Sequence, residues 1–376
     1  MDSPTVSFVV PCYGLAHFLT ECVESIVSQT YEHFEIIIMD DCSSDNTPDV
    51  ARSFCDLRVR YVRNERNLGH LQNYNHGINI SRGKYIWLIS ADDRLRCPDV
   101  LSRYVNVLEE HPDVGYVFCA GIGLEDGVET QVLPYYYYGA ADKLFSGKEF
   151  ILTVLRQGGG LLSPSVMARK ECYEKVGLFP LDMPHQGDMF LWFAWALDYN
   201  VAYLAEPMVN YRSHDRNMMK HLLARHIEAV FSDEINVLWR IKRKVEEKGL
   251  RRLARELEGA IAEKYARVTN SEYCADTSPW SMSISECSRS LYEYSRNRLE
   301  YRRISALFME RLGDKQWRRY DFRNARSSYR FALVNNWKLL SVWPRLLLLL
   351  LQMGVVGIFI RNLRLRILNR QRRLSI

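Results

Sequence analysis

The amino-terminal part of the chain alternates short apolar runs with segments of helical periodicity. Residues 5–10 (TVSFVV) are almost wholly apolar, which predicts a buried strand, and the segment AHFLTECVESIVSQT that follows has apolar residues at helical spacing. We predict further strands at 35–40, 59–63, 84–90 and 114–119, and helices at 47–55, 70–81 and 98–109. Such alternation is typical of an α/β fold, a doubly wound and mostly parallel sheet with helices on both faces.

The pattern changes after residue 146. The stretch SGKEFILTVLRQ predicts a helix and SVMARK a short strand, and after Arg216 apolar residues recur at helical spacing for roughly a hundred residues. We therefore divide the chain into a Rossmann-like α/β domain at 1–215, a helical appendage at 216–335 and a carboxyl-terminal tail at 336–376.

The tail combines an apolar segment with a basic one. Residues 346–360 are mostly apolar but shorter than the roughly 20 residues of a spanning helix, and six arginines follow between 361 and 373. This pattern predicts a re-entrant or interfacial segment whose arginines face anionic headgroups on the cytoplasmic side. The alternative is a buried terminal helix with a solvated basic end.

The charge of the chain is concentrated in this tail. The formal charge is +5, yet eight Lys or Arg and no acid lie from residue 336 onward, which leaves 42 basic and 45 acidic residues elsewhere. A near-neutral body argues against nucleic-acid binding. Nine cysteines without a C-x-x-C pair, and a start without a basic leader, indicate a cytoplasmic protein on the inner face of the membrane.

Two of the predicted strands end in adjacent carboxylates. Asp40 and Asp41 follow one strand, and Asp92 and Asp93 follow another. Parallel strands deliver such residues to one edge of a sheet, where ligands of α/β proteins bind. Four acids would repel one another unless a cation or donor groups of a ligand lay between them, and Mg2+ carrying a diphosphate meets that need. Helix capping, the alternative role, does not explain doubled acids at two equivalent strand ends.

Several ordered motifs extend this pattern. They are VVPCYG, QTYEHFEIIIMDDCSSDNT, NERNLGHLQNYNHGI, GKYIWLISADD, GLFP and YRSHDRN. With them, the first 215 or so residues resemble the catalytic domain of glycosyltransferase family 2, which has the GT-A fold. The resemblance implies an inverting, metal-dependent and non-processive transferase, because the processive members' Q-x-x-R-W stretch is absent from the sequence.

The resemblance also implies roles for residues of the nucleotide-sugar site. Pro11 and Tyr13 would line the nucleotide pocket, and Asp41 would accept a hydrogen bond from the base. Asn75 and Asp92 match further positions of the nucleotide-sugar site.

Two further matching residues concern the metal ion, and one concerns the general base of the reaction. Asp93 and His214 would approach a Mg2+ or Mn2+ ion, and Asp188, before a predicted helix, matches the general base. Capping of that helix is the structural alternative for Asp188. The chain departs from the family at Gly187, where a Glu is usual, and at Ser90, where an Asp is common.

A third departure is Tyr74, which stands where an Arg is common. This leaves the diphosphate without one expected cation. Lys84, Arg82, Arg94 or a basic residue of the RSHDR segment could replace it, and the sequence does not select among them.

The expected reaction moves a sugar from a nucleotide-sugar donor, with UDP favoured, to a saccharide or polyprenyl-linked acceptor in surface polysaccharide assembly. One rival is a non-catalytic nucleotide-binding scaffold with a degenerate transferase fold. A second, a nucleotidyltransferase, lacks its usual Gly-rich phosphate loop here. The stretch PYYYYGA at 134–140 is either an aromatic platform for an acceptor or a packed surface loop.

Overall fold

The computed structural model describes residues 4–158, 160–218, 226–269, 281–319 and 321–336, with Leu339, Val342 and Pro344. These residues form two compact units. The first takes in the residues up to 218 and Ala229–Leu253, and the second takes in 226–228 and the described residues from Ala254 onward.

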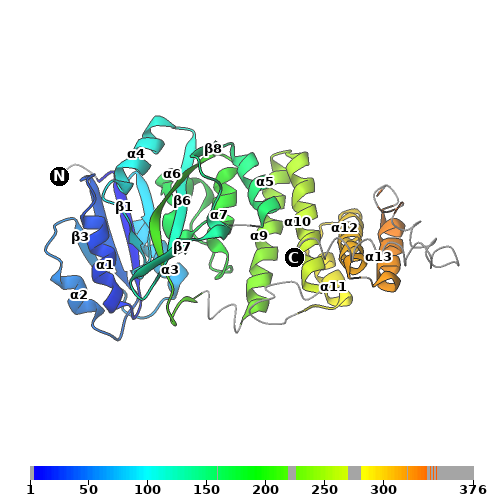
Figure 1. The fold of residues 1–376 in the computed structure, drawn as a ribbon, viewed down its shortest axis with the longest axis horizontal. Coiled ribbons are helices and arrows are strands. Elements are labelled where there is room, and N and C mark those ends of the chain that lie inside the picture. The colour runs from blue at the N-terminus through cyan, green and yellow to red at the C-terminus, as the bar shows by residue number, and fades with distance from the viewer. Residues whose placement is uncertain are drawn as a thin grey trace, which may run out of the picture. The chain divides into compact units, whose positions relative to one another are not determined.

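A mixed sheet forms the centre of the first unit (Figure 1). Its described strands are β1 (Val6–Cys12), β2 (Phe34–Asp40), β3 (Val59–Arg63), β4 (Tyr85–Leu88), β5 (Arg94–Leu95), β6 (Val114–Glu125), β7 (Val128–Val132), β8 (Lys143–Phe145), β9 (Met167–Arg169) and β10 (Asn200–Arg212). Their order is β3-β2-β1-β4-β9-β6-β10-β5, with β7 beside β6 and β8 beside β10. Strands β1 to β4 pair in parallel, as do β6 and β10, whereas the short strands β5, β7, β8 and β9 run antiparallel to their partners.

Helices cover both faces of this sheet, which confirms the predicted α/β architecture. The helices of the first unit are α1 (Ala16–Val27), α2 (Thr47–Ser53), α3 (His70–Ile80), α4 (Val100–Glu110), α5 (Gly147–Gln157), α6 (Lys170–Val176), α7 (Gly187–Ala196) and most of α9 (Ile227–Glu247). Helices α1 and α4 share one core cluster with the side chains of Phe8 and Val117. On the other face, Gly77 of α3 approaches Val9, and Tyr116 contacts α7. Alternate residues of a strand point to opposite faces, so each strand serves two helix layers.

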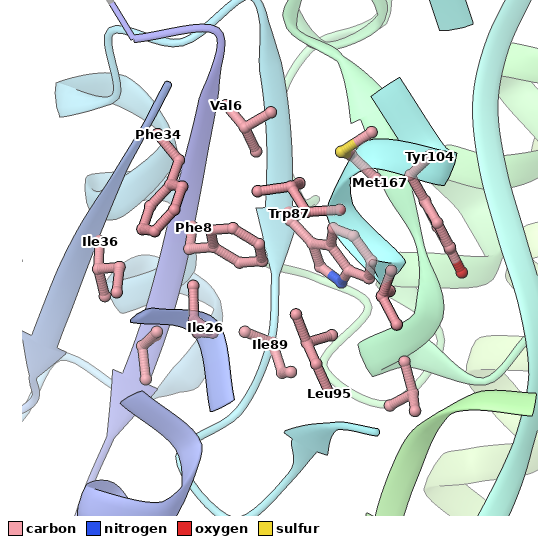
Figure 2. Packing of buried hydrophobic residues seen from close by; sticks show 14 of the residues in the cluster. Val6, Phe8, Ile26, Phe34, Ile36, Trp87, Ile89, Leu95, Tyr104 and Met167 are labelled. Atoms are coloured by element: carbon pink, nitrogen blue, oxygen red, sulfur yellow. The ribbon is translucent and has the colours of Figure 1, made fainter. Parts of the chain in front are cut away.

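The core on the α1 and α4 face is built around stacked aromatic rings (Figure 2). Trp87 stacks on Phe8 at 5.3 Å and on Tyr104 at 4.4 Å between ring centroids. The Trp87 indole N–H donates to the Pro164 carbonyl at 2.8 Å, and the Tyr104 hydroxyl donates to the Ser165 carbonyl at 2.9 Å. Both acceptors belong to a short 3-10 helix, η2 (Ser163–Ser165), so the core fixes this segment in place.

Helix α9 packs within the first unit. The backbone N–H of His185 donates to Asp233 at 2.8 Å, and Arg240 forms an ion pair with Asp182. The sequence analysis grouped these residues with the helical appendage. The structure shows that residues 229–253 contact the loop before α7, which carries Asp188.

The second unit is helical, in agreement with the predicted helical segment after the sheet. Its helices are α10 (Arg251–Thr269), α11 (Ile284–Tyr294), α12 (Arg298–Arg318) and α13 (Phe322–Asn335). The apolar and basic segments predicted at 346–373 lie outside the described residues. In the described part of the chain, no helix combines the length and apolarity needed to cross a membrane.

A close approach between α5 and α7 provides a test of the packing. Gly147 begins α5, and a Cβ atom there would lie 1.8 Å from the Ala196 carbonyl oxygen at the end of α7. We expect Gly147→Ala to lower the free energy of unfolding by about 2 kcal/mol or more, because backbone must move. Gly259 of α10 has open space around it, so Gly259→Ala should instead stabilise by about 0.5–1 kcal/mol. Urea unfolding followed by circular dichroism measures both, and equal effects of the two substitutions would contradict the packing.

Candidate active site

A cleft of about 490 Å³ opens at the carboxyl ends of β1, β2 and β4. Six of the residues predicted from the sequence line it: Pro11, Tyr13, Asp41, Asp92, Asp93 and Asp188. Two others, Asn75 and His214, are not among the lining residues. Residues separated by up to 177 positions in the chain are thus brought together, because the carboxyl ends of β1, β2 and β4 and the first turn of α7 all border this cleft.

Asp41 is held in the cleft by a set of donors. One carboxylate oxygen accepts hydrogen bonds from the Asn64 amide at 2.9 Å and the Leu68 N–H at 2.8 Å, and the other accepts from the Gly69 N–H at 2.9 Å. Gly69 has a φ of +80°, which glycine adopts readily, and it lets the backbone turn toward the carboxylate. Asp41 is therefore a fixed acceptor, 3% exposed.

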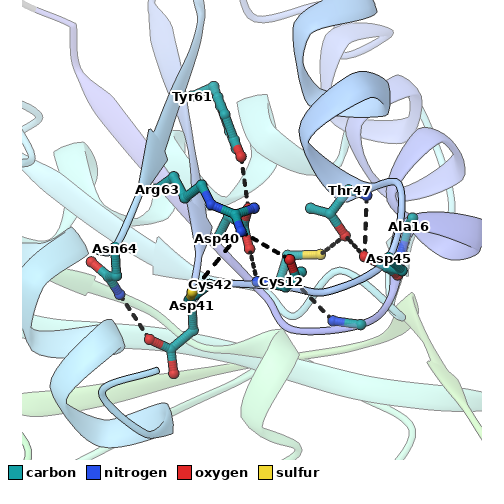
Figure 3. A network of polar contacts seen from close by, with 12 residues as sticks. Cys12, Ala16, Asp40, Asp41, Cys42, Asp45, Thr47, Tyr61, Arg63 and Asn64 are labelled. Atoms are coloured by element: carbon teal, nitrogen blue, oxygen red, sulfur yellow. Dashed lines mark hydrogen bonds and ion pairs between the residues drawn. The ribbon is translucent and has the colours of Figure 1, made fainter. Parts of the chain in front are cut away.

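Asp40 does not line the cleft, so the expectation that four acids meet there is wrong for this residue. Its side chain accepts hydrogen bonds from the Tyr61 hydroxyl at 2.7 Å, Arg63 at 2.8 Å and the Ser43 N–H at 2.8 Å (Figure 3). Consecutive residues of a strand point to opposite sides, so only one of the two acids can face the ligand. Asp40 is a structural residue that joins β2 to β3.

Asp92 and Asp93 both line the cleft, in the loop that follows β4. Burial, and then the neighbouring charge of Asp92, raises the pKa of Asp93 well above its ordinary value. The buried Oδ1 oxygen of Asp92 has no hydrogen-bond partner among the described residues. Two adjacent carboxylates, one with an unpartnered buried oxygen, form an acceptor-rich site that lacks a positive charge between them.

Arg212 fixes the loop that carries these two acids. Its backbone N–H donates to Asp93 at 3.0 Å, and its Nε donates to the Asp92 carbonyl at 2.8 Å. The guanidinium also forms an ion pair with Glu21 of α1, as does Arg94. The sequence analysis did not identify Arg212 or Glu21, although Arg212 lies within the YRSHDRN motif.

His214 contacts Asp92 rather than the cleft. Its Nε2 lies 2.9 Å from Asp92 Oδ2, and its Nδ1 accepts the Arg216 backbone N–H at 3.1 Å. A neutral imidazole that accepts at Nδ1 carries its proton on Nε2, so His214 donates to Asp92 in this arrangement. A lone pair for a metal at Nε2 would require that the Arg216 contact be broken.

These residues fit a divalent cation. A hard ion such as Mg2+ or Mn2+ takes carboxylate oxygens as ligands, usually one or two from the protein. Asp93 and the unpartnered oxygen of Asp92 supply such ligands, and a cation there would relieve the repulsion between them. The observed contact of His214 orients Asp92, as partners of ligating carboxylates commonly do.

Asp188 lies in the first turn of α7, at the other side of the cleft. Its Oδ1 accepts the Met189 N–H at 2.7 Å, and the N-cap of the helix is Gln186, not Asp188. Burial raises the pKa of Asp188 to about 6, against the lowering effect of its contacts with Met189 and Ser163. After burial, the charge of Asp188 contributes to the raised pKa of Tyr74 and of Tyr136, so both hydroxyls lie near it. A carboxylate with such a pKa can accept a proton near neutral pH.

Asn75 lies behind the wall of the cleft. Its amide donates to the Phe179 carbonyl and accepts the Phe179 N–H, both at 2.9 Å, so it holds the loop of the GLFP motif. Phe179 and the neighbouring Tyr74 do line the cleft, and their rings lie 5.6 Å apart. Any effect of Asn75 on a ligand would pass through this loop.

Arg216 is the only Lys or Arg among the described residues that line the cleft. Its guanidinium donates to the Gly14 carbonyl at 3.1 Å, beside Tyr13. The other cations considered for the missing positive charge form ion pairs elsewhere: Arg82 with Glu35, Lys84 with Glu109, and Arg94 and Arg212 with Glu21. Of the candidates that the sequence left open, Arg216 is thus the one that lines the cleft.

Comparison with sequence families gives one match. Residues 7–156 match the family described as Glycosyl transferase family 2. An uncharacterized glycosyltransferase of Rickettsia typhi is 29% identical over 219 residues, 57% of this chain and 65% of that protein. The glycosyltransferase GlyG of Streptococcus pneumoniae is 39% identical over 114 residues, 30% of this chain and 38% of that protein. The matches thus span less than two thirds of the length of these relatives.

Comparison with solved structures identifies the fold as GT-A. Residues 1–349 of S. aureus TarS, in complex with UDP-GlcNAc, superpose with a TM-score of 0.59 at 16% identity, covering 86% of this chain and 90% of that one. The mannosyltransferase PcManGT from Pyrobaculum calidifontis, in complex with GDP-Man and Mn2+, has a TM-score of 0.50 at 16% identity, covering 90% and 88%. The predicted fold class is therefore confirmed.

The raised pKa of Asp188 predicts a stability gain on its removal. Because this pKa is higher in the folded protein than in the unfolded chain, folding favours the protonated acid, and stability falls as the pH rises through about 6. We expect Asp188→Asn to raise the free energy of unfolding at pH 8 by roughly 2 kcal/mol, with a gain that shrinks toward pH 4. Urea unfolding at several pH values measures this difference.

Asp56 provides a control of opposite sign. Its pKa is lowered by its hydrogen bonds to Arg58, with which it forms an ion pair at 2.7 Å. Asp56→Asn should therefore lower the stability at pH 8. A loss of stability in Asp188→Asn at pH 8 would show that the buried carboxylate is favourably solvated and would contradict the assigned environment.

Proposed function

We propose that this chain, whose residues 7–156 match glycosyl transferase family 2, is an inverting glycosyltransferase that uses a nucleotide-sugar donor and a hydroxyl acceptor. One observation carries the proposal. Three groups line the same cleft. They are Asp41, which accepts hydrogen bonds, the potential metal ligands Asp92 and Asp93, and Asp188, whose pKa is raised. Each of the three matches a separate requirement of glycosyl transfer from a nucleoside diphosphate.

The nucleotide would lie beside Asp41. A carboxylate accepts but does not donate when ionised, so it selects a base edge that presents an N–H, as uracil does at N3. Pro11 and Tyr13 line the same part of the cleft, and Tyr13 is 58% exposed, which leaves its ring open for contact with a base or ribose. Guanine presents an N–H as well, so the choice of a UDP-sugar as the favoured donor rests on the likeness to TarS, which was solved in complex with UDP-GlcNAc.

Asp92 and Asp93 would hold Mg2+ or Mn2+, with His214 keeping Asp92 in position. When bound, such an ion supplies Lewis-acid stabilisation of the charge on a departing diphosphate. Arg216 adds a second positive charge to the cleft, at the mouth formed with Gly14. We assign to Arg216 the role of the arginine that the family commonly has at the position of Tyr74.

Asp188 would act as the general base. The acceptor hydroxyl oxygen attacks the anomeric carbon, its proton passes to Asp188, and the bond to the diphosphate oxygen breaks with its electron pair on the leaving nucleotide. A single displacement inverts the anomeric configuration, by the logic that applies to inverting glycosidases. With a pKa raised to about 6, Asp188 is ionised at neutral pH but is a stronger base than an exposed aspartate.

The acceptor would be a saccharide linked to a polyprenyl carrier in surface polysaccharide assembly. This part of the proposal rests on the sequence of the tail, where apolar residues 346–360 precede six arginines. Such a segment would hold the protein at the cytoplasmic face of a membrane, next to a lipid-linked acceptor.

Turnover measurements with Asp188→Asn test the proposal. We expect the wild-type chain with Mn2+ to release UDP from a UDP-sugar, and Asp188→Asn to lose about 100-fold or more of kcat/KM while UDP binds as before. The wild-type kcat/KM should rise with pH through about 6, as Asp188 loses its proton.

A thermal-shift panel of UDP, GDP, TDP and CDP, with and without Mn2+, provides the binding control. A ligand at 100 times its dissociation constant stabilises the fold by about 2.7 kcal/mol. The enzyme proposal fails if no nucleotide stabilises the protein under any metal condition. Nucleotide binding without turnover of any sugar donor would favour the scaffold instead.

The role of Arg216 gives a further prediction. Loss of a charge-assisted contact to the diphosphate should weaken UDP binding by about tenfold to a hundredfold in Arg216→Ala, while binding of uridine is unchanged. Arg103, whose ion pair with Glu206 lies outside the cleft lining, is the matched control. Isothermal titration measures both ligands, and equal losses for UDP and uridine would contradict a diphosphate contact.

A further inference from the structure

Four consecutive tyrosines, Tyr135 to Tyr138, connect β7 to β8, and they divide into an anchored and an exposed set. Tyr138 is buried, and its hydroxyl donates to the Gly160 carbonyl at 3.1 Å. Its ring contacts Phe118 and Phe150 in the core. Tyr135 and Tyr137, by contrast, are 55% and 41% exposed. Because Tyr138 is anchored in the core, the neighbouring Tyr135 and Tyr137 are exposed on a segment that is itself held in place.

Two rings of the run, those of Tyr135 and Tyr136, lie close to the start of α7. A Cβ atom on Gly160 would be 3.3 Å from a ring carbon of Tyr135, 3.6 Å from Cε of Met189 and 3.9 Å from a ring carbon of Tyr136. Met189 directly follows Asp188 in α7. The tyrosine run and the start of α7 therefore meet over the bare backbone of Gly160.

The half-buried Tyr136 links the run to the acids of the cleft. Its ring packs against Tyr135 at a right angle, with 5.1 Å between centroids. Burial, and then the charge of Asp188, raises the pKa of Tyr136, and the pKa of the cleft residue Tyr211 is raised by burial, Asp93 and Tyr136 in turn. Both effects agree with a position of Tyr136 next to the cleft.

We propose that Tyr135 and Tyr137 form an acceptor subsite, on which the pyranose ring of the acceptor saccharide stacks while Asp188 takes the proton of its hydroxyl. This inference rests on the proposed function. The apolar C–H face of a pyranose matches the face of a tyrosine ring, and the tyrosine hydroxyl can bond to sugar hydroxyls. The segment 134–139 (PYYYYG) contains no charged residue, which favours a neutral sugar ring over a phosphate group.

The arrangement of the cleft supports this assignment. Asp41, Asp93 and Arg216 would contact the nucleotide and its diphosphate, and they follow the carboxyl ends of β2, β4 and β10. Asp188 lies in the first turn of α7. In the proposed arrangement the acceptor reaches Asp188 from the side of α7 on which Tyr135 lies near Met189. Gly160 matters here because a side chain there would press on the Tyr135 ring.

The test compares acceptor and donor readouts in the full chain with Mn2+ and the best UDP-sugar. Methyl glucoside, methyl galactoside and methyl mannoside serve as acceptors, and octyl glucoside reports any contribution of a lipid chain. We expect the double variant Tyr135→Ala, Tyr137→Ala to raise the acceptor KM about tenfold or more, and Tyr135→Phe, Tyr137→Phe to keep the wild-type value, because the rings carry the contact. Hydrolysis of the donor by water should be unchanged in both.

Tyr292 of α11 is the matched control, since it is 66% exposed and belongs to the second unit. Tyr292→Ala should transfer sugar like the wild type. Saturation-transfer NMR from the aromatic protons to the methyl glycosides gives a readout that needs no turnover. We expect signals on the sugar C–H protons of the wild type, weakened in the alanine double variant.

The outcomes separate this inference from the proposed function. Donor hydrolysis with an unchanged acceptor KM in the alanine double variant, or no saturation transfer to any glycoside, overturns the subsite and leaves the transferase intact. Sugar transfer by the wild type to octyl glucoside but to none of the methyl glycosides would show a contact with the lipid chain and would overturn sugar stacking. Absence of donor hydrolysis and of nucleotide binding in every protein overturns the proposed function and the subsite with it.

Discussion

The repulsion between Asp92 and Asp93 is the constraint on which the rest of the site depends. Both carboxylates lie in the same cleft, and the burial of Asp93 makes the presence of two charges there costly. The surrounding residues hold the acids in place without neutralising them fully: the Arg212 N–H donates to the Asp93 carboxylate, its Nε donates to the Asp92 main-chain carbonyl, and His214 donates to the Asp92 carboxylate. The guanidinium of Arg212 is itself directed to Glu21. This arrangement of the two acids is the one that the proposed cation site requires.

A short strand makes this arrangement possible. Two residues after Asp92, β5 pairs with β10, where Leu95 lies opposite Val209 and Arg94 opposite Asn210. The pairing places the acidic loop beside the end of β10, which carries Arg212 and is followed by His214 and Arg216. The end of β10 thus positions the two proposed metal ligands and leads to Arg216, the one Lys or Arg among the described residues that line the cleft.

Much of the fold followed from periodicity, because the buried strands β1 and β2 and the helices α1, α3 and α4 carry strong local patterns. Strand β10 was missed since Pro207 lies in it and its pairing with β6 shifts between Leu204 and Val209. The different roles of Asp40 and Asp41 were also hidden. They depend on the register of β2 with β3, which sets Arg63 opposite Asp40, and no local pattern encodes that pairing. The sequence could not identify the basic residue of the cleft for a similar reason. The other candidate arginines and the lysine form ion pairs with Glu21, Glu35 and Glu109, which lie in distant parts of the chain.

The same residue type serves different purposes in this cleft because the environments differ. Asp41 receives three N–H donors, which satisfy its charge and make it a fixed acceptor. Asp188 has one backbone donor at 2.7 Å, and burial raises its pKa to about 6, so it binds a proton far more readily than an exposed aspartate. Separate environments of this kind are how enzymes obtain distinct roles from identical side chains. Holding Asp188 ionised in this half-buried position costs free energy, and its proposed role as a base would account for that cost.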